Sequence, residues 1–215
     1  MKTLIPQIAA LALTVSASML PADTLVKWDF GGEDGTQEKT APVAGSVSPH
    51  LDASPITRGT GFPVGTGSLF TQNSMTFWMV PGVNTADDAV EKGAYFEITL
   101  TPKNGSALSL QSVAFSSRRA SKLSGPNKFI IRSSTDGFGS DIAGPDETQP
   151  EPVPEGADVN ISLGGSLDNL TQPVTLRFYG FGRNKADNLD GGIWCIANSS
   201  TAGGLTIEGT VTTKP

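Results

Sequence analysis

The segment YFEITL, from Tyr95 to Leu100, decides the fold because apolar and polar residues alternate along it without a break. Successive side chains of a β-strand point to opposite faces, so the three apolar residues share one face and the polar ones share the other. Pro102 and the Asn104-Gly105 pair follow, and these residue types favour a tight turn. The segment therefore predicts an amphipathic strand that leads into a hairpin.

The segment after this turn changes its spacing part of the way along. Its apolar residues are Leu108, Leu110, Val113 and Phe115. Leu108 and Leu110 are two positions apart, whereas Leu110 and Val113 are three positions apart. One inserted residue moves the alternation of a strand to the other face, which is the effect of a β-bulge. We therefore predict a bulge near Gln111 and Ser112.

Short alternating runs continue along the rest of the chain. They lie at 25–30, near 56, and at 75–80, 128–132, 161–163, 174–179, 193–197 and 205–211. The 215 residues include 25 glycines and 15 prolines, and no long segment has the period of a helix. We predict an all-β fold, a single antiparallel β-sandwich or jelly roll of about ten short strands over residues 23–215.

Residues 1–22 have the features of a secretory signal peptide. Lys2 precedes an apolar run at 8–15, and small residues follow that run. A membrane-spanning helix needs about 20 apolar residues, so the run is too short to cross a bilayer. We expect a secreted or extracellular protein, with the periplasm or the cell surface as alternatives, and no membrane span.

The charge balance limits the partners. The chain holds 15 basic and 21 acidic residues, a formal net charge of −6, whereas nucleic-acid binding needs a basic surface. Nucleic acid is therefore not expected as a partner.

One stretch is nonetheless rich in basic residues: Arg118, Arg119, Lys122, Lys128 and Arg132. It is either a solvated hairpin or a surface for an anionic polysaccharide, and we favour the hairpin.

Few residues suited to catalysis are present. The chain has one histidine, His50, in a segment typical of a loop, and one cysteine, Cys195, in an apolar run of strand length. A cysteine in such a run is typically a small buried hydrophobic residue. One histidine and one cysteine do not suffice for a zinc site. No catalytic residue is predicted, and no cofactor is expected apart from the calcium considered next.

Calcium is an alternative because it is bound by oxygen ligands alone. Asp187 and Asp190 stand in a loop that ends in two glycines, and Asp136 and Asp141 form a second pair. Neither loop has a complete calcium-binding signature. Each is therefore either a structural calcium site or a plain turn, and we favour the turn.

Aromatic residues beside polar ones in loops are the candidates for ligand binding, because aromatic rings can stack on sugars while amides and charged groups reach their hydroxyls. The candidates are Trp78, Tyr179, Phe181, Arg183, Asn184, Asn188, Asp190 and Trp194. The alternative is that Trp28, Trp78 and Trp194 belong to the core.

Two arginines are expected on the polar face of predicted strands. Arg177 shares that face with Tyr179, and Arg132 also points outward. A guanidinium on a strand can hold a carboxylate of the protein itself or of a ligand. We favour an internal ion pair.

Four motifs give the chain a resemblance to a known group. They are Trp28-Asp29-Phe30-Gly31-Gly32, Arg132-Ser133-Ser134-Thr135-Asp136-Gly137-Phe138, Arg177-Phe178-Tyr179-Gly180 and Gly204-Leu205-Thr206-Ile207-Glu208-Gly209. Their order resembles exported bacterial β-sandwich modules of cell-surface and PEP-CTERM-sorted proteins, similar in outline to galactose-binding-like jelly rolls. The resemblance implies that the Ser-x-Asp-Gly step turns one strand back and that the first and last strands pair. It bears on the fold more than on an activity.

Export, the strand pattern and the aromatic-polar window predict a secreted, non-catalytic β-sandwich module that binds carbohydrate or extracellular matrix. The alternatives are a structural or adhesive surface protein without a small ligand and, less favoured, a polysaccharide hydrolase or lyase.

Overall fold

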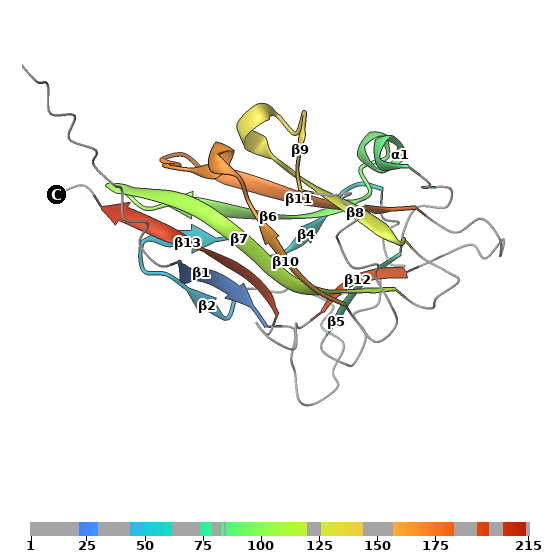
Figure 1. Cartoon of the computed structure of the whole chain (residues 1–215), viewed down its shortest axis with the longest axis horizontal. Coiled ribbons are helices and arrows are strands. Elements are labelled where there is room, and N and C mark those ends of the chain that lie inside the picture. The colour runs from blue at the N-terminus through green and yellow to red at the C-terminus, as the bar shows by residue number, and fades with distance from the viewer. Residues whose placement is uncertain are drawn as a thin grey trace, which may run out of the picture.

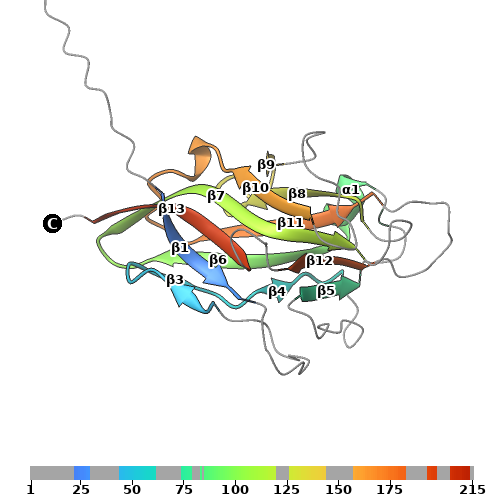
Figure 2. The same ribbon diagram turned by 60° about the horizontal axis from the view of Figure 1, so that its bottom comes forward.

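The computed structural model describes residues 22–29, 44–61, 74–78, 83, 85–119, 126–143, 157–182, 193–197 and 204–213. These residues form two antiparallel sheets that lie one over the other, as Figures 1 and 2 show. The predicted all-β sandwich is therefore confirmed. The described part of the chain holds no helix that is long and apolar enough to cross a membrane.

One sheet has seven strands. They are β1 (Asp23–Trp28), β2 (Ser46–Val47), β5 (Ser74–Trp78), β7 (Ser106–Arg119), β10 (Ala157–Ser162), β12 (Ile193–Ala197) and β13 (Leu205–Thr213). Their order is β2-β1-β13-β7-β12-β5, and β10 also pairs with β7. The first and last strands, β1 and β13, are neighbours, as the resemblance implies.

The other sheet has six strands. They are β3 (Leu51–Ala53), β4 (Thr57–Arg58), β6 (Tyr95–Pro102), β8 (Lys128–Ser133), β9 (Asp141–Ala143) and β11 (Val174–Phe181). Their order is β3-β6-β11-β8-β9, and β4 also pairs with β6. Three short helical elements complete the described structure: α1 (Ala86–Glu91), η1 (Ser134–Asp136) and η2 (Gly165–Leu167).

The core between the sheets is built around stacked aromatic rings. Phe96 of β6 stacks on Phe178 of β11 and on Trp194 of β12, with ring centroids 5.0 and 5.1 Å apart. All three side chains are buried. The indole N–H of Trp194 donates to the Ser117 hydroxyl at 3.0 Å, and that of Trp28 donates to the Ser54 carbonyl at 3.2 Å. Trp28 and Trp194 are therefore core residues, as the alternative interpretation of the tryptophans predicts.

The predicted alternation and the predicted bulge are both present. In β6 the residues Phe96, Ile98 and Leu100 are buried, while the residues between them are partly exposed. In β7, Ser112 pairs with Glu208 and Leu110 pairs with Gly209, so Gln111 is the extra residue of a bulge. The bulge keeps apolar residues on the core side of β7 before and after it.

Two features go beyond the prediction. The described residues form thirteen strands rather than about ten, because two-residue and three-residue strands pair with the sheet edges. The helix α1 was not predicted, since six residues are too few to show a helical period. Its start is nevertheless encoded locally: the Thr85 hydroxyl accepts a hydrogen bond from the Asp88 backbone N–H at 3.1 Å.

Candidate functional site: a cluster on the outer face of the six-stranded sheet

Charged residues form a row across four strands on the face of the six-stranded sheet that points away from the core. Arg177 of β11 lies opposite Glu97 of β6 on one side and opposite Arg132 of β8 on the other. Arg132 in turn lies opposite Asp141 of β9. Because side chains directly opposite each other in a sheet are in reach of one another, the register brings two arginines and two carboxylates together.

Each arginine is paired with a carboxylate of its own. Arg177 Nε donates to Glu97 Oε2 at 2.9 Å, and Arg132 Nε donates to Asp141 Oδ1 at 2.6 Å. The Arg177 and Glu97 side chains are 26% and 29% exposed, so their outer edges remain open to solvent. The predicted internal ion pairs are therefore confirmed.

The Arg177 guanidinium is held between two aromatic rings. Its central carbon lies 4.2 Å from the centroid of the Tyr95 ring and 3.8 Å from that of the Phe138 ring. A guanidinium over an aromatic face is attracted by the electrons of the ring. Two rings and an ion pair fix the position of this side chain, although it is partly exposed.

Phe138 reaches this position because of an unusual turn. Gly137 and Phe138 both have positive φ, at 71° and 64°, between η1 and β9. The Phe138 carbonyl accepts a hydrogen bond from Arg132 at 3.2 Å, so the same residue contacts both arginines. The Ser-x-Asp-Gly step thus turns β8 back toward β9, as the resemblance implies.

The environment shifts the pKa of two members of the group. Burial acts to lower the pKa of Arg177, but hydrogen bonds to Glu97 and to the Tyr179 hydroxyl outweigh it, and the pKa lies above its ordinary value. Burial raises the pKa of Tyr179 above its ordinary 10.0, and the nearby Arg177 offsets only part of this. Arg177 is therefore a permanent cation and Tyr179 a neutral phenol at physiological pH.

We call the group the outer-face cluster. Its members are Tyr95, Glu97, Arg132, Phe138, Asp141, Arg177 and Tyr179.

The residues predicted to bind a ligand divide into two sets. Tyr179, Phe181 and Trp194 are described, and their side chains are 1%, 6% and 0% exposed. A ring buried among other residues has no face free to stack on a sugar, so these three do not form the expected stacking surface. The others are Arg183, Asn184, Asn188 and Asp190, which lie outside the described residues, and Trp78, whose side chain does.

The two candidate calcium loops have different outcomes. Asp187 and Asp190 lie outside the described residues. The Asp136 carboxylate caps its own turn: it accepts hydrogen bonds from the backbone N–H groups of Gly139 and Ser140 and from the Ser140 hydroxyl. The Ser140 hydroxyl, partly opposed by burial and aided by the backbone N–H groups, lowers the pKa of Asp136. Asp141 is paired with Arg132. Asp136 and Asp141 therefore fit the plain turn that we favoured from the sequence. Among the described residues, no group of three or more candidate metal ligands is found.

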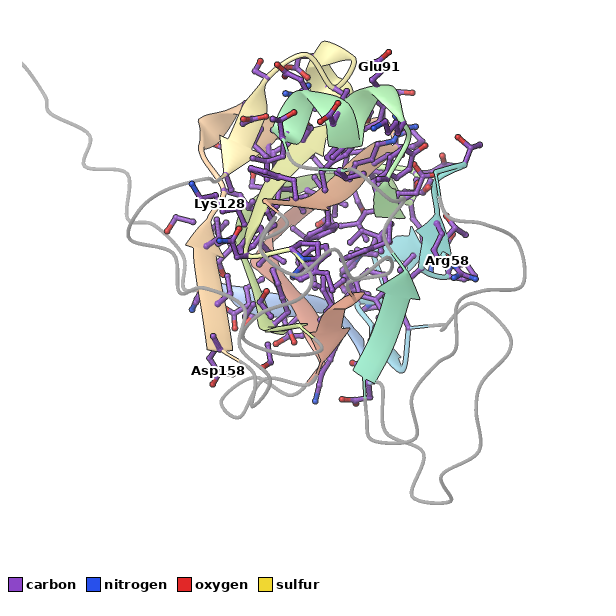
Figure 3. The ribbon with its side chains drawn as sticks, turned by 90° about the vertical axis from the view of Figure 1, so that its right-hand side faces the viewer. Arg58, Glu91, Lys128 and Asp158 are labelled. Atoms are coloured by element: carbon purple, nitrogen blue, oxygen red, sulfur yellow. The ribbon has the colours of Figure 1, made fainter. Side chains whose placement is uncertain are left out.

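The structure describes only part of the basic stretch. Lys128 is exposed on the flank of the sandwich (Figure 3), and Arg132 belongs to the outer-face cluster. The side chains of Arg118, Arg119 and Lys122 lie outside the described residues. Arg132 is therefore committed to a carboxylate of the protein.

Three members of the outer-face cluster were missed as site residues: Tyr95, Glu97 and Phe138. The alternation in YFEITL places the first two on the outer face. Their cross-strand partners depend on a register that connects residues 80 positions apart, as in the Arg177–Glu97 hydrogen bond. A single sequence holds no direct signal for that register.

No protein-family model matches this chain, and no curated protein matches it either.

Proposed function

We propose that this protein is a secreted, non-catalytic β-sandwich module that binds carbohydrate or extracellular matrix through the outer-face cluster. The observation that carries the proposal is the partly exposed Arg177, which is fixed between Tyr95 and Phe138 and paired with Glu97. Sugar-binding surfaces need hydrogen-bonding groups in fixed positions beside aromatic rings.

Fixed position is the property that distinguishes this group from ordinary surface charges. A mobile arginine loses side-chain entropy when it binds a ligand, whereas one already held by neighbours loses little. Both rings lie against the guanidinium, with their centroids 4.2 and 3.8 Å from its central carbon. Arg177 Nε donates to Glu97 and another N–H bonds the Tyr179 hydroxyl, so a partner would use the remaining N–H groups. Sites on sheet strands are also more rigid than sites on loops.

The proposal is tested by affinity electrophoresis of the purified protein in gels that contain neutral or acidic polysaccharides. We expect at least one polysaccharide to slow the native protein and to leave the heat-unfolded protein unaffected. Arg177→Lys should weaken the retardation, because lysine keeps the charge but loses the planar fork and the stacking. Lys128→Ala is the matched control, since it removes a basic group from a strand of the same sheet outside the cluster.

Two results would contradict the proposal. One is a native protein that no polysaccharide in the panel slows. The other is a release of reducing sugar from the panel, which would indicate a hydrolase or lyase and not a binding module.

A structural or adhesive role without a small ligand is the second candidate. The observation that favours it is that both arginines of the cluster already have protein carboxylates as partners. This role predicts concentration-dependent assembly in light scattering. A strict monomer that polysaccharide retards would reject it.

A further inference from the structure

The outer-face cluster contains equal numbers of positive and negative groups. Arg177 is paired with Glu97, and Arg132 is paired with Asp141. The two arginines would attract an acidic ligand. The two carboxylates, which lie 2.9 and 2.6 Å from their arginines, would repel it. The cluster itself therefore gives an anionic polymer no net electrostatic advantage.

The elements around the cluster add negative charge. The helix α1 packs against β11, and Figures 1 and 3 show it on the same side of the six-stranded sheet as the turn between β8 and β9. Asp87, Asp88 and Glu91 belong to α1, and the neighbouring Lys92 is within 3.8 Å of Asp88. The hairpin carries Asp136, which is ionised at neutral pH as an ordinary aspartate is. Together with the net charge of −6, these groups oppose the approach of an acidic polymer.

A paired arginine and carboxylate match two adjacent hydroxyl groups. The guanidinium offers only donors, and the carboxylate offers only acceptors. A hydroxyl both donates and accepts, so one hydroxyl can accept from Arg177 while its neighbour donates to Glu97. The 2.9 Å contact between the two side chains sets their donor and acceptor edges next to each other. Such bonds to charged groups are stronger than those between neutral partners.

Hydroxyl groups continue along the same face. Thr99 of β6 and Thr175 of β11 lie directly opposite each other, and their hydroxyl oxygens are 2.8 Å apart. Both threonines are partly exposed and stand two residues from Glu97 and Arg177 respectively. The face next to the ion pair is therefore polar and uncharged, which suits a hydroxyl-rich ligand.

We propose that the outer-face cluster binds neutral sugar units with adjacent hydroxyl groups, and not uronic or sulfated sugars. This inference rests on the proposed function and specifies its ligand class. It also decides against an anionic polysaccharide as the partner, since Arg132 of the basic stretch is neutralised by Asp141.

The test compares polysaccharides that differ mainly in charge. The pairs are polygalacturonate with its carboxyl-reduced form, dextran sulfate with dextran, and carboxymethyl cellulose with hydroxyethyl cellulose, each in gels of low and high salt. We expect retardation by neutral members only, with little dependence on salt. Stronger retardation by an acidic member than by its neutral partner, lost at high salt, would overturn the inference and leave the proposed function standing. No retardation by any member would contradict the proposed function itself.

Glu97→Gln sharpens the test because it removes one negative charge and keeps the shape of the side chain. We expect about tenfold weaker retardation by the neutral polysaccharide, equivalent to one lost charged hydrogen bond. Asp52→Asn is the matched control: Asp52 is on β3 of the same sheet and pairs with Lys103 at 3.3 Å, outside the cluster. Circular dichroism and the urea midpoint show whether the Glu97→Gln variant is folded. If the folded variant is retarded by the neutral polysaccharide as strongly as the unsubstituted protein, the inference is overturned.

Discussion

The two faces of the six-stranded sheet use aromatic rings for different purposes. On the inner face, Phe96 and Phe178 stack with their ring planes 10° apart and are buried. On the outer face of the same two strands, Tyr95 packs against the Arg177 guanidinium and is partly exposed. Rings that pack on rings fill the core and stabilise the fold, whereas rings that pack on a charged group fix its position. The strands thus combine a stabilising face with a face suited to recognition.

The largest expected effect comes from deleting the same ring type on each face. Phe178→Ala should lower the free energy of unfolding by about 3–5 kcal/mol, because it leaves a cavity among Phe96 and Phe115. Phe138→Ala on the outer face should cost about 0.5–1 kcal/mol, the energy typical of a cation–π contact at a partly exposed site. Urea unfolding measures both values. If both variants lost the same free energy of unfolding, the rings of the two faces would not differ in their contribution to stability.

The next effect comes from adding one carbon to the inner face. A Cβ at Gly180 would lie 2.7 and 2.9 Å from atoms of the Trp194 ring, closer than side chains pack. We expect Gly180→Ala to lower the free energy of unfolding by about 1–3 kcal/mol through overpacking. Gly164→Ala is the control, since nothing lies within 4 Å of its added Cβ and its φ is −66°. The glycine at 180 would have no packing role if both variants unfolded at the same urea concentration.

A smaller effect is expected for the ion pair of the cluster. A double-mutant cycle with Arg177→Gln and Glu97→Gln should give a coupling energy of about 0.5–1 kcal/mol, because both side chains are more than two-thirds buried but not fully so. The Lys103–Asp52 pair, 47% and 73% exposed, should give a coupling energy near zero. A coupling energy for the exposed pair as large as that for Arg177 and Glu97 would show that the two rings add no order to the cluster.

The fold could be predicted from the sequence to the extent that it depends on local patterns. Alternation along YFEITL identified β6 and its buried face, and one change of spacing located the bulge at Gln111. Each of these signals is contained within a few neighbouring residues. The six-residue helix α1 and the shortest strands were missed because they are too brief to establish a period.

The site could be predicted only in part. The outward direction of Arg132 and Arg177 follows from alternation, and their pairing with protein carboxylates was expected. Which carboxylates they contact depends on the order of the strands, β6-β11-β8-β9, and this order is set by the packing of the whole sandwich. The same dependence explains Tyr179: alternation places it on the outer face, but its burial there comes from neighbours that are distant in sequence.

The smallest effect concerns the ionisation of Tyr179 at high pH. The chain has two tyrosines, so the tyrosinate absorbance of Tyr95→Phe reports on Tyr179 alone. Its pKa is raised, so we expect the absorbance of the folded variant to rise with a midpoint above pH 10.0. The unfolded chain ionises this group at its ordinary pKa and is then favoured, so its contribution to stability is complete below pH 10 and is lost as the pH rises through the folded pKa. Tyr179→Phe should therefore flatten the alkaline part of the stability curve relative to the unsubstituted protein. A titration midpoint at or below 10.0 would show that the outer face leaves the phenol hydrated, and that only the inner face of this sheet excludes water.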